Sequence, residues 1–522
     1  MVLLALLCPL LALAATTDSW RARSVYQIIT DRFARSDPAD LTPCDPLKKE
    51  YCGGTWKGIH DHLDYIQGMG FSAIWISPIV ENIPHNTSQG YAYHGYWTKD
   101  LYSLNSHFGS RDDLVSLQKA LAKRDMYLMV DVVVNHVGSA QVAKDFTGED
   151  ITPFSKMSDY HPLCYIYNWS NQTQVEQCWV SEQTPDVDTE SDFVINIYNN
   201  WIGDLVKNYS IDGLRIDTVK HVRQSFWPKF VQSSGVFAIG EVLADTTNYT
   251  CAYQNYMPSV FNYALYYRLQ RAFLSPAGSI SDLATMLKNN TRDCKDTLLL
   301  GNFIENADQP RYPANTSDPS QIANAFTYTL FADGIPFFYY GQEQNFTGAS
   351  DPSNREPLWT SNYSTTSPSY IEIAKLNSFR NHIIAQSYDF VTSHMSLIYQ
   401  DNNTLALFKD SLLFILTNLG QHGPQYTLAL SKSGFPSGTQ ITEVDGCTQL
   451  TAGTNGALDV KMETGRPRIL YPTNLLNGSG LCGHSNNTGN DTDRSAGIRL
   501  TPLDFWSFWQ GSFFLVVLLF GI

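Results

Sequence analysis

A chain of 522 residues is too long for one ordinary domain and suits a large barrel with an additional module. Hydrophobic residues make up 43% of the chain and charged residues 16%, which allows a sizeable core and excludes an intrinsically disordered protein. The formal net charge of −15 argues against nucleic acids and anionic membrane surfaces as partners.

Both ends of the chain have the composition of targeting segments. Residues 1–15 are an apolar run that ends in small residues, which predicts a signal peptide although no Lys or Arg precedes the run. Residues 505–522 are apolar and uncharged, and a triplet of small residues that starts at Ser495 lies upstream. This order is typical of a GPI-attachment signal. A plain tail anchor and attachment at Asn490 remain alternatives.

The cysteines and glycosylation sequons also indicate the secretory pathway. Of the nine cysteines, Cys8 leaves with the signal peptide, and no C-x-x-C pair marks a zinc cluster. Disulfides are therefore expected, and the spacing alone leaves their pairing open. Sequons such as Asn86, Asn208, Asn315 and Asn486 predict a glycosylated surface. We expect the protein at the outer face of the plasma membrane, held by a GPI lipid, or in the cell wall.

Short apolar runs alternate with amphipathic stretches over the first three quarters of the chain. The expected strands are residues 25–29, 73–76, 127–130, 214–216, 237–239, 298–300 with 303–304, and 335–339. Between them, residues 112–123 predict a helix, and Ser110 with Asp113 resembles a capping box. Alternating strands and helices predict an α/β fold with a parallel sheet, and about eight such units favour a (β/α)8 barrel.

Two stretches depart from this alternation. Residues 136–187, after the third strand, are rich in Tyr, Asp, Asn and Gln and predict a small inserted domain, domain B. Residues 390–482 hold short strands between Gly- and Asn-rich turns, which predicts a C-terminal all-β sandwich. The barrel would then comprise residues 16–135 and 188–389, and residues 483–504 would be a polar linker.

Carboxylates follow four of the expected strands, at the end where a barrel of this kind places its functional residues. They are Asp131, Asp217, Glu241 and the pair Glu305 and Asp308. One acid at a strand end is usually a loop cap or an ion-pair partner, but four at successive ends should converge on one cleft. Hydrolysis of a glycosidic bond needs two carboxyl groups, one ionised and one protonated. Crowding of like charges would raise the pKa of one of them.

The segments around these acids resemble the four signature regions of glycoside hydrolase family 13. They read DVVVNH at 131–136, GLRIDTVKH at 213–221, GEV at 240–242 and FIENAD at 303–308. YHGYW at 93–97, GQEQ at 341–344 and DPSNRE at 351–356 agree with the same family. The resemblance runs from about residue 20 to 482 and is closest to the secreted fungal α-amylases.

This resemblance implies a role for each matching residue. Asp217 would be the nucleophile that forms a glycosyl-enzyme, Glu241 the acid/base, and Asp308 the residue that holds the hydroxyls of the distorted sugar at subsite −1. Arg215 would keep Asp217 ionised. The other implied substrate contacts are His94, Tyr96 and His136 at the −1 sugar with Trp97 beside them, Lys220 and His221 on the acceptor side, and Asp351 and Arg355 at donor subsites further out.

The resemblance also implies a structural calcium ion and a set of disulfides. The Ca²⁺ ligands would be the Asn135 side chain, Glu176, Asp186 and the backbone carbonyl of His221, an oxygen set that suits this ion. Without the resemblance, Glu176 and Asp186 would be interpreted as solvated surface acids. The implied disulfides are Cys44–Cys52, Cys164–Cys178, Cys251–Cys294 and Cys447–Cys482.

Ala307 departs from the family, in which a histidine precedes the aspartate of the fourth region. An alanine cannot donate a hydrogen bond to the sugar, and losing one such donor costs on the order of 3 kcal/mol, or roughly 100-fold in rate. The alanine and the GPI-like tail together favour the subgroup of GPI-anchored relatives that act as α-glucanotransferases. An aromatic residue, Trp169, could add acceptor binding.

We therefore expect a monomeric cell-surface 4-α-glucanotransferase that acts on α-1,4-glucan of the cell wall and hydrolyses it weakly. The first alternative is an endo-acting α-amylase, which hydrolyses starch. The second is a non-catalytic glucan-binding wall protein, which the retained Asp217, Glu241 and Asp308 disfavour.

Overall fold

The computed structural model describes residues 15–485. Nearly all of the expected signal peptide, Asn490, Ser495 and the apolar tail lie outside these residues. Within them, we find no helix with the length and apolar composition that a membrane span requires.

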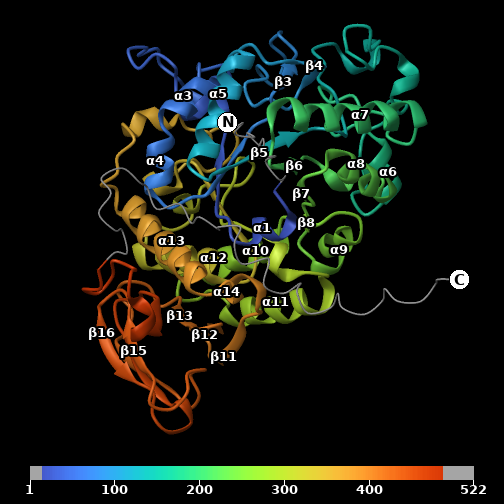
Figure 1. Ribbon diagram of the computed structural model, residues 1–522. Coiled ribbons are helices and arrows are strands. Elements are labelled where there is room, and N and C mark those ends of the chain that lie inside the picture. The colour runs from blue at the N-terminus through green and yellow to red at the C-terminus, as the bar shows by residue number, and fades with distance from the viewer. Residues whose placement is uncertain (1–14, 486–522) are drawn as a thin grey trace, which may run out of the picture.

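Eight parallel strands form the centre of the molecule, in the spatial order β8-β7-β6-β5-β2-β1-β10-β9. Their bounds are β1 Val25–Ile28, β2 Ala73–Ile76, β5 Tyr127–Val132, β6 Gly213–Ile216, β7 Phe237–Gly240, β8 Ser259–Val260, β9 Gly301–Asn302 and β10 Ile335–Tyr339. The sheet closes on itself because Phe261, directly after β8, pairs in parallel with Gly301 of β9. The predicted (β/α)8 barrel is confirmed (Figure 1).

The barrel strands read as unbroken apolar runs because helices cover the outer face of the sheet and side chains fill its interior. The helices of six residues or more around the barrel are α3 Trp56–Asp61, α4 Leu63–Gly68, α5 Arg111–Lys123, α7 Asp192–Tyr209, α8 Trp227–Ser234, α9 Thr247–Ala252, α10 Tyr263–Ala272, α11 Ile280–Asp293, α12 Pro319–Phe331 and α13 Pro368–Gln386. Helix α5 begins with the expected capping box, in which Ser110 and Asp113 each accept a backbone N–H of the other.

One expected strand is misplaced, because neither 298–300 nor 303–304 is a strand and β9 occupies the two residues between them. Residues 297–299 form the 3-10 helix η7 (Thr297–Leu299), and the strand that follows has only two residues. The side chain of Asp296 accepts the N–H of Leu298 and so caps a helical turn. A short apolar run fits a buried helical turn as well as a strand, so its hydrophobicity could not distinguish them.

The segment between β5 and α7 contains little regular structure apart from α6 (Gln172–Gln177) and two 3-10 turns. Its two ends return to the same place, because His136 pairs with Asp186 and Tyr160 pairs with Val187 in antiparallel bridges. The insertion therefore sits over the carboxyl end of β5, beside the rim of the barrel. Neighbouring it is a hairpin of β3 (Val80–Asn82) and β4 (Thr98–Leu104).

The C-terminal part of the described chain is built from β-strands apart from two 3-10 turns, as expected for an all-β domain. One sheet contains β11 Ser396–Gln400, β12 Thr404–Lys409, β13 Leu412–Thr417, β15 Gln440–Glu443, β16 Thr448–Thr451 and β18 Arg468–Pro472, and the other pairs β14 Tyr426–Leu430 with β17 Leu458–Met462. Their apolar side chains share one core. Figure 1 shows this lobe in orange and red next to the barrel, where α12 is buried on every side because it packs on both β10 and β13.

The eight described cysteines form four disulfides. The pairs are Cys44–Cys52, Cys164–Cys178, Cys251–Cys294 and Cys447–Cys482, the same pairs that the resemblance implied.

Candidate active site

Arg215 of β6 is the centre of a buried charge cluster at the carboxyl end of the barrel. Its Nη1 lies 2.7 Å from Asp217 Oδ1 and 3.0 Å from Asp131 Oδ1, and its Nη2 lies 2.8 Å from Glu241 Oε2. The arrangement follows from strand geometry. Asp131 pairs directly with Arg215 across two neighbouring strands, and Asp217, two residues further on, points to the same side as Arg215. Glu241 directly follows β7.

Two of the acids that the sequence placed at strand ends are fully bound by other groups of the protein. Asp131 lies within β5 rather than beyond it, 1% exposed, and accepts hydrogen bonds from Tyr96 Oη and Trp75 Nε1 as well as from Arg215. Glu305 is buried in an ion pair with Arg311 at 3.0 Å. Neither side chain is free to react with a sugar. The expectation that all the strand-end acids converge on one cleft is therefore wrong for Glu305. Asp131 does lie in the cluster, where it binds Arg215.

Asp308 does not contact Arg215 directly and pairs with a cation of its own, Arg355. Arg355 Nη2 lies 3.0 Å from Asp308 Oδ1, and Arg355 Nε lies 3.1 Å from Asp351 Oδ1. The Arg355 side chain is nearly buried, whereas both aspartate side chains are about half exposed. Arg355 therefore fixes the position of two carboxylates that solvent or a sugar can reach.

Burial and mutual repulsion act together on the two central acids. Burial raises the pKa of Asp217 and that of Glu241 above the usual carboxyl range, and Arg215 opposes the shift in both. The charge of Asp217 raises the pKa of Glu241 further. With Asp131 also on the same guanidinium, Asp217 and Glu241 favour the state in which one of them is ionised and the other holds a proton.

The histidines expected at the −1 sugar are uncharged near neutral pH. Burial lowers the pKa of His136 to about 4 and places that of His94 well below its ordinary value. His94 Nδ1 accepts the N–H of Tyr96 at 3.0 Å, so its proton is on Nε2. His136 Nε2 contacts the Tyr96 carbonyl at 3.2 Å and is already occupied. His94 is therefore the better donor to a substrate.

The remaining expected contacts divide into surface and buried groups. Lys220 Nζ donates to the Leu243 carbonyl at 2.9 Å and lies 5.1 Å from the ring centre of Trp169, which is 57% exposed. His221 is buried, and its ring bonds to the Val175 carbonyl at 3.0 Å. Trp97 is also buried, and it packs edge-on against His94 rather than forming a surface.

One residue that sequence reasoning missed is Tyr263, the first residue of α10. Its hydroxyl accepts a hydrogen bond from Asn306 Nδ2 at 3.0 Å and lies 3.4 Å from Glu241 Oε1, to which it donates. Asn306 in turn accepts the N–H of Asp308. Tyr263 thus joins the loop of Asp308 to Glu241. It follows β8, a strand of two residues that is too short to predict.

Ala307 offers the cleft no polar side chain and almost no surface, because it is 2% exposed. Its carbonyl accepts hydrogen bonds from Asn354 Nδ2 at 3.0 Å and Arg355 Nε at 3.1 Å. The backbone at this position is therefore fixed even though the side chain contributes nothing to binding.

The residues expected to bind calcium meet where the inserted segment joins the barrel. The Val187 N–H donates to the Asn135 carbonyl at 2.9 Å, which places Asp186 beside Asn135. Helix α6, which carries Glu176, packs on the 3-10 helix η4 (Val219–His221). Among the described residues, buried Asp186 Oδ1 finds no hydrogen-bond partner, and burial raises the pKa of Asp186 to about 7. A buried carboxylate oxygen without a partner fits a Ca²⁺ ion.

Family comparisons agree with this geometry. Residues 27–400 match the family model for the α-amylase catalytic domain, and residues 397–490 match that for α-amylase domain C. The chain belongs to the α-amylase family. It is thus a glycoside hydrolase that acts on α-glucan, and this family typically binds calcium.

Individual relatives cover nearly the whole chain. Alpha-amylase 2 of Schwanniomyces occidentalis is 45% identical over 476 residues, which is 90% of this chain and 94% of the relative. The α-amylase structure from Malbranchea cinnamomea is 44% identical with a TM-score of 0.88, covering 90% of this chain and 100% of that one. An α-amylase from Geobacillus thermoleovorans complexed with acarbose is 29% identical with a TM-score of 0.76, covering 86% of this chain and 98% of that one.

Proposed function

We propose that this α-amylase family member is an endo-acting α-1,4-glucan hydrolase that retains the α configuration. The observation that carries the proposal is the guanidinium of Arg215, which binds Asp217 at 2.7 Å and Glu241 at 2.8 Å through its two amino groups. Two carboxyl groups that share one guanidinium lie close together. This favours the separation of about 5–5.5 Å found in retaining glycosidases over the roughly 6.5–9.5 Å of inverting ones.

The reaction would proceed in two displacements. Ionised Asp217 attacks the anomeric carbon while protonated Glu241 gives its proton to the leaving glycosidic oxygen, so that a glycosyl ester forms and the bond to the leaving chain breaks. Glu241, now ionised, takes a proton from water, whose oxygen attacks the same carbon and releases Asp217. Asp308, held by Arg355, would accept hydrogen bonds from the sugar hydroxyls, and His94 Nε2 would donate one.

We propose hydrolysis, rather than the glucanotransfer expected from the sequence, as the main reaction. The relatives described above are α-amylases by name, and this supports water as the principal acceptor. Ala307 favours 4-α-glucanotransfer as a second candidate, because the missing hydrogen-bond donor slows hydrolysis. A sugar hydroxyl can attack the glycosyl-enzyme in the same way as water and release Asp217. The exposed Trp169 beside Lys220 would offer such a sugar a flat face.

Product chromatography from maltoheptaose tests both candidates. We expect products shorter than the substrate, whereas early products longer than maltoheptaose would show that transfer is the main reaction. Asp217→Asn should lower either activity by at least roughly 10⁴-fold, since removing a nucleophile leaves only binding and electrostatic effects. Asp112→Asn, an exposed acid on α5, is the matched control and should leave the rate unchanged. Full activity in Asp217→Asn would refute the assignment.

For calcium, the Asn135 side chain, Glu176, Asp186 and the His221 carbonyl are the proposed ligands. A bound ion would connect the insertion to the barrel and so fix His136 and Lys220, which adjoin these ligands in sequence. The ion supplies rigidity and takes no part in the displacements.

We also propose that a GPI lipid attaches the mature protein to the outer face of the plasma membrane. The support is the composition of residues 495–522. If a phosphatidylinositol-specific phospholipase releases the activity from intact cells, GPI attachment is supported. If all of the activity is already in the medium before the phospholipase is added, GPI attachment is contradicted.

A further inference from the structure

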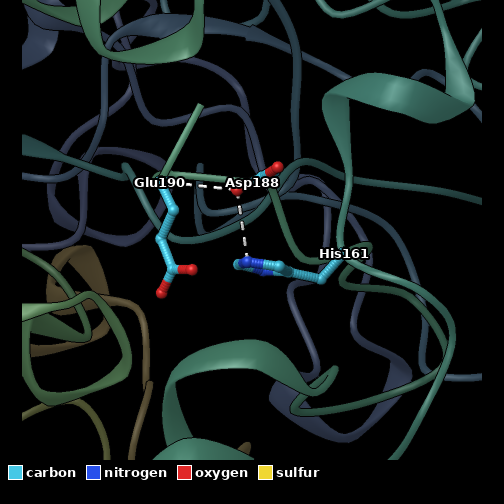
Figure 2. Close-up of side chains that lie close together, drawn as sticks. All are labelled: His161, Asp188 and Glu190. Atoms are coloured by element: carbon cyan, nitrogen blue, oxygen red, sulfur yellow. Dashed lines mark hydrogen bonds and ion pairs between the residues drawn. The ribbon is translucent and has the colours of Figure 1, made fainter. Parts of the chain in front are cut away.

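A second group of cation-binding side chains lies beside Asp186, where the inserted segment returns to the barrel. His161, Asp188 and Glu190 each present one ligand atom, and these atoms lie within 4.8 Å of one another. Figure 2 shows the imidazole of His161 directed at both carboxylates. None of the three is a proposed calcium ligand or belongs to the charge cluster around Arg215.

The hydrogen bonds of His161 define which of its nitrogens can bind a metal. Nδ1 lies 2.6 Å from Asp186 Oδ2, an acceptor, so the ring donates from Nδ1. Within residues 15–485, the buried Nε2 has no hydrogen-bond partner, although Asp188 Oδ1 lies only 3.3 Å away, and the side chain is 8% exposed. Metal-binding histidines commonly donate their other N–H to a carboxylate in this way, which leaves a lone pair for the ion.

The distances fit a small tetrahedral ion. Two ligands bound at about 2.0 Å to such an ion are about 3.3 Å apart, which is the separation of His161 Nε2 and Asp188 Oδ1. The backbone holds both residues, because the His161 N–H donates to the Asp186 carbonyl at 3.0 Å and the Asp188 N–H donates to that of Asp159 at 2.9 Å. Only the Glu190 side chain has to move to complete the set.

Glu190 has other partners that a metal would have to compete with. Arg223 Nη2 lies 2.6 Å from Glu190 Oε1, and Gln177 Nε2 donates to both oxygens at 3.1 and 3.0 Å. The Arg223 side chain is 50% exposed and can turn into solvent at little cost. Arg223 therefore supplies the positive charge here when no ion is bound.

We propose that His161 Nε2, Asp188 and Glu190 bind a zinc-type divalent ion, with water in the fourth position. An imidazole nitrogen with two carboxylates suits zinc, whereas calcium prefers oxygen ligands throughout. The ion fastens His161 of the inserted segment to the residues that precede α7. It is a structural clip that stabilises the insertion next to, and separately from, the calcium junction.

Calorimetric titration of the calcium-loaded, full-length protein with zinc chloride tests the proposal. We expect one zinc ion per chain with no release of calcium. Glu190→Gln and Asp188→Asn should each weaken the zinc affinity at least about tenfold, since even outer-shell changes cost that much. Arg223→Gln should strengthen it, and Glu182→Gln, an exposed acid of the same segment, should not change it.

Substituting Co²⁺ for zinc provides a second readout, because a tetrahedral site with a nitrogen ligand gives the ion a visible absorption that Glu190→Gln should alter. These variants keep His161, whose bond to Asp186 supports the local fold. The proposal is overturned if no zinc binds, if zinc displaces calcium mole for mole, or if the affinity is the same in Glu190→Gln and Asp188→Asn as in the unmodified protein.

Discussion

At the scale of single residues, Tyr263 acts on the proton of Glu241. Its hydroxyl lies 3.4 Å from Glu241 Oε1 and stabilises the ionised carboxylate by donating to it. In Tyr263→Phe the pKa of Glu241 should therefore rise, and the alkaline limb of the kcat/KM profile should move to higher pH by roughly 0.5–1 unit, the worth of one hydrogen bond. The measurement is the pH dependence of maltoheptaose hydrolysis.

Tyr266→Phe is the matched control for this shift. Tyr266 lies one turn along the same helix, and its hydroxyl contacts Gln309 at 3.5 Å rather than Glu241. A Tyr263→Phe enzyme whose alkaline limb stays in place, with only its thermal stability reduced, would show that Tyr263 is structural.

Ala307 stands where the family has a hydrogen-bond donor to the sugar. Restoring a donor in Ala307→His should raise hydrolysis relative to transfer by up to about 100-fold, because the imidazole would bind the sugar in the transition state. Ala307→Leu adds similar bulk without a donor and should give no such gain. If the product ratio from maltoheptaose is the same in both variants, the missing donor does not determine how the glycosyl-enzyme is partitioned.

At the scale of elements, the proposed calcium ion should stabilise the junction of the inserted segment with the barrel. The buried Asp186 carboxylate has an oxygen without a partner among the described residues, so removing calcium should destabilise this junction first. We expect EDTA to lower the Tm, with a loss of about 4 kcal/mol if calcium had been present at 1,000 times its Kd. Differential scanning calorimetry at several calcium concentrations measures it.

Two variants separate the calcium junction from the proposed zinc clip. Asp186→Asn should remove most of the dependence of Tm on calcium, whereas Glu190→Gln should preserve it. A Tm that does not change with calcium in the unmodified protein would contradict the assignment of Asn135, Glu176, Asp186 and His221.

At the scale of the whole molecule, a buried ion pair connects the barrel to the C-terminal sandwich. Lys409 at the end of β12 lies 2.9 Å from Asp333, which follows α12, and the two side chains are 3% and 9% exposed. Removing one partner of a buried ion pair typically costs about 3–5 kcal/mol, and the His394 ring 3.1 Å from Asp333 Oδ2 should keep the loss in Lys409→Met near the lower end. The free energy of unfolding of the C-terminal transition should fall by about that amount in urea.

The double variant Lys409→Met with Asp333→Asn tests the cause. Removing both charges should recover part of the lost stability, because no unpaired charge is then buried. If the double variant is as unstable as the sum of the two single variants, packing rather than charge accounts for the loss.

The sequence alone determined the features that depend on neighbours along the chain. Strands such as 73–76 and 335–339 are apolar at every position because both faces are buried, and the capping box at Ser110 is complete within four residues. Asp217 could be placed near Arg215 for the same reason, since alternate residues of a strand share a face.

Only the tertiary structure decided which side chains meet across the fold. Asp131 and Glu305 looked like Asp217 and Glu241 in sequence, yet Asp131 also accepts hydrogen bonds from Tyr96 and Trp75, and Glu305 pairs with a different arginine, Arg311. Tyr263 reaches Glu241 from the first turn of α10, after a strand of two residues. His161 faces Asp188 and Glu190 because two distant segments pair as β-bridges. Such contacts depend on backbone positions fixed by packing, which local periodicity does not encode.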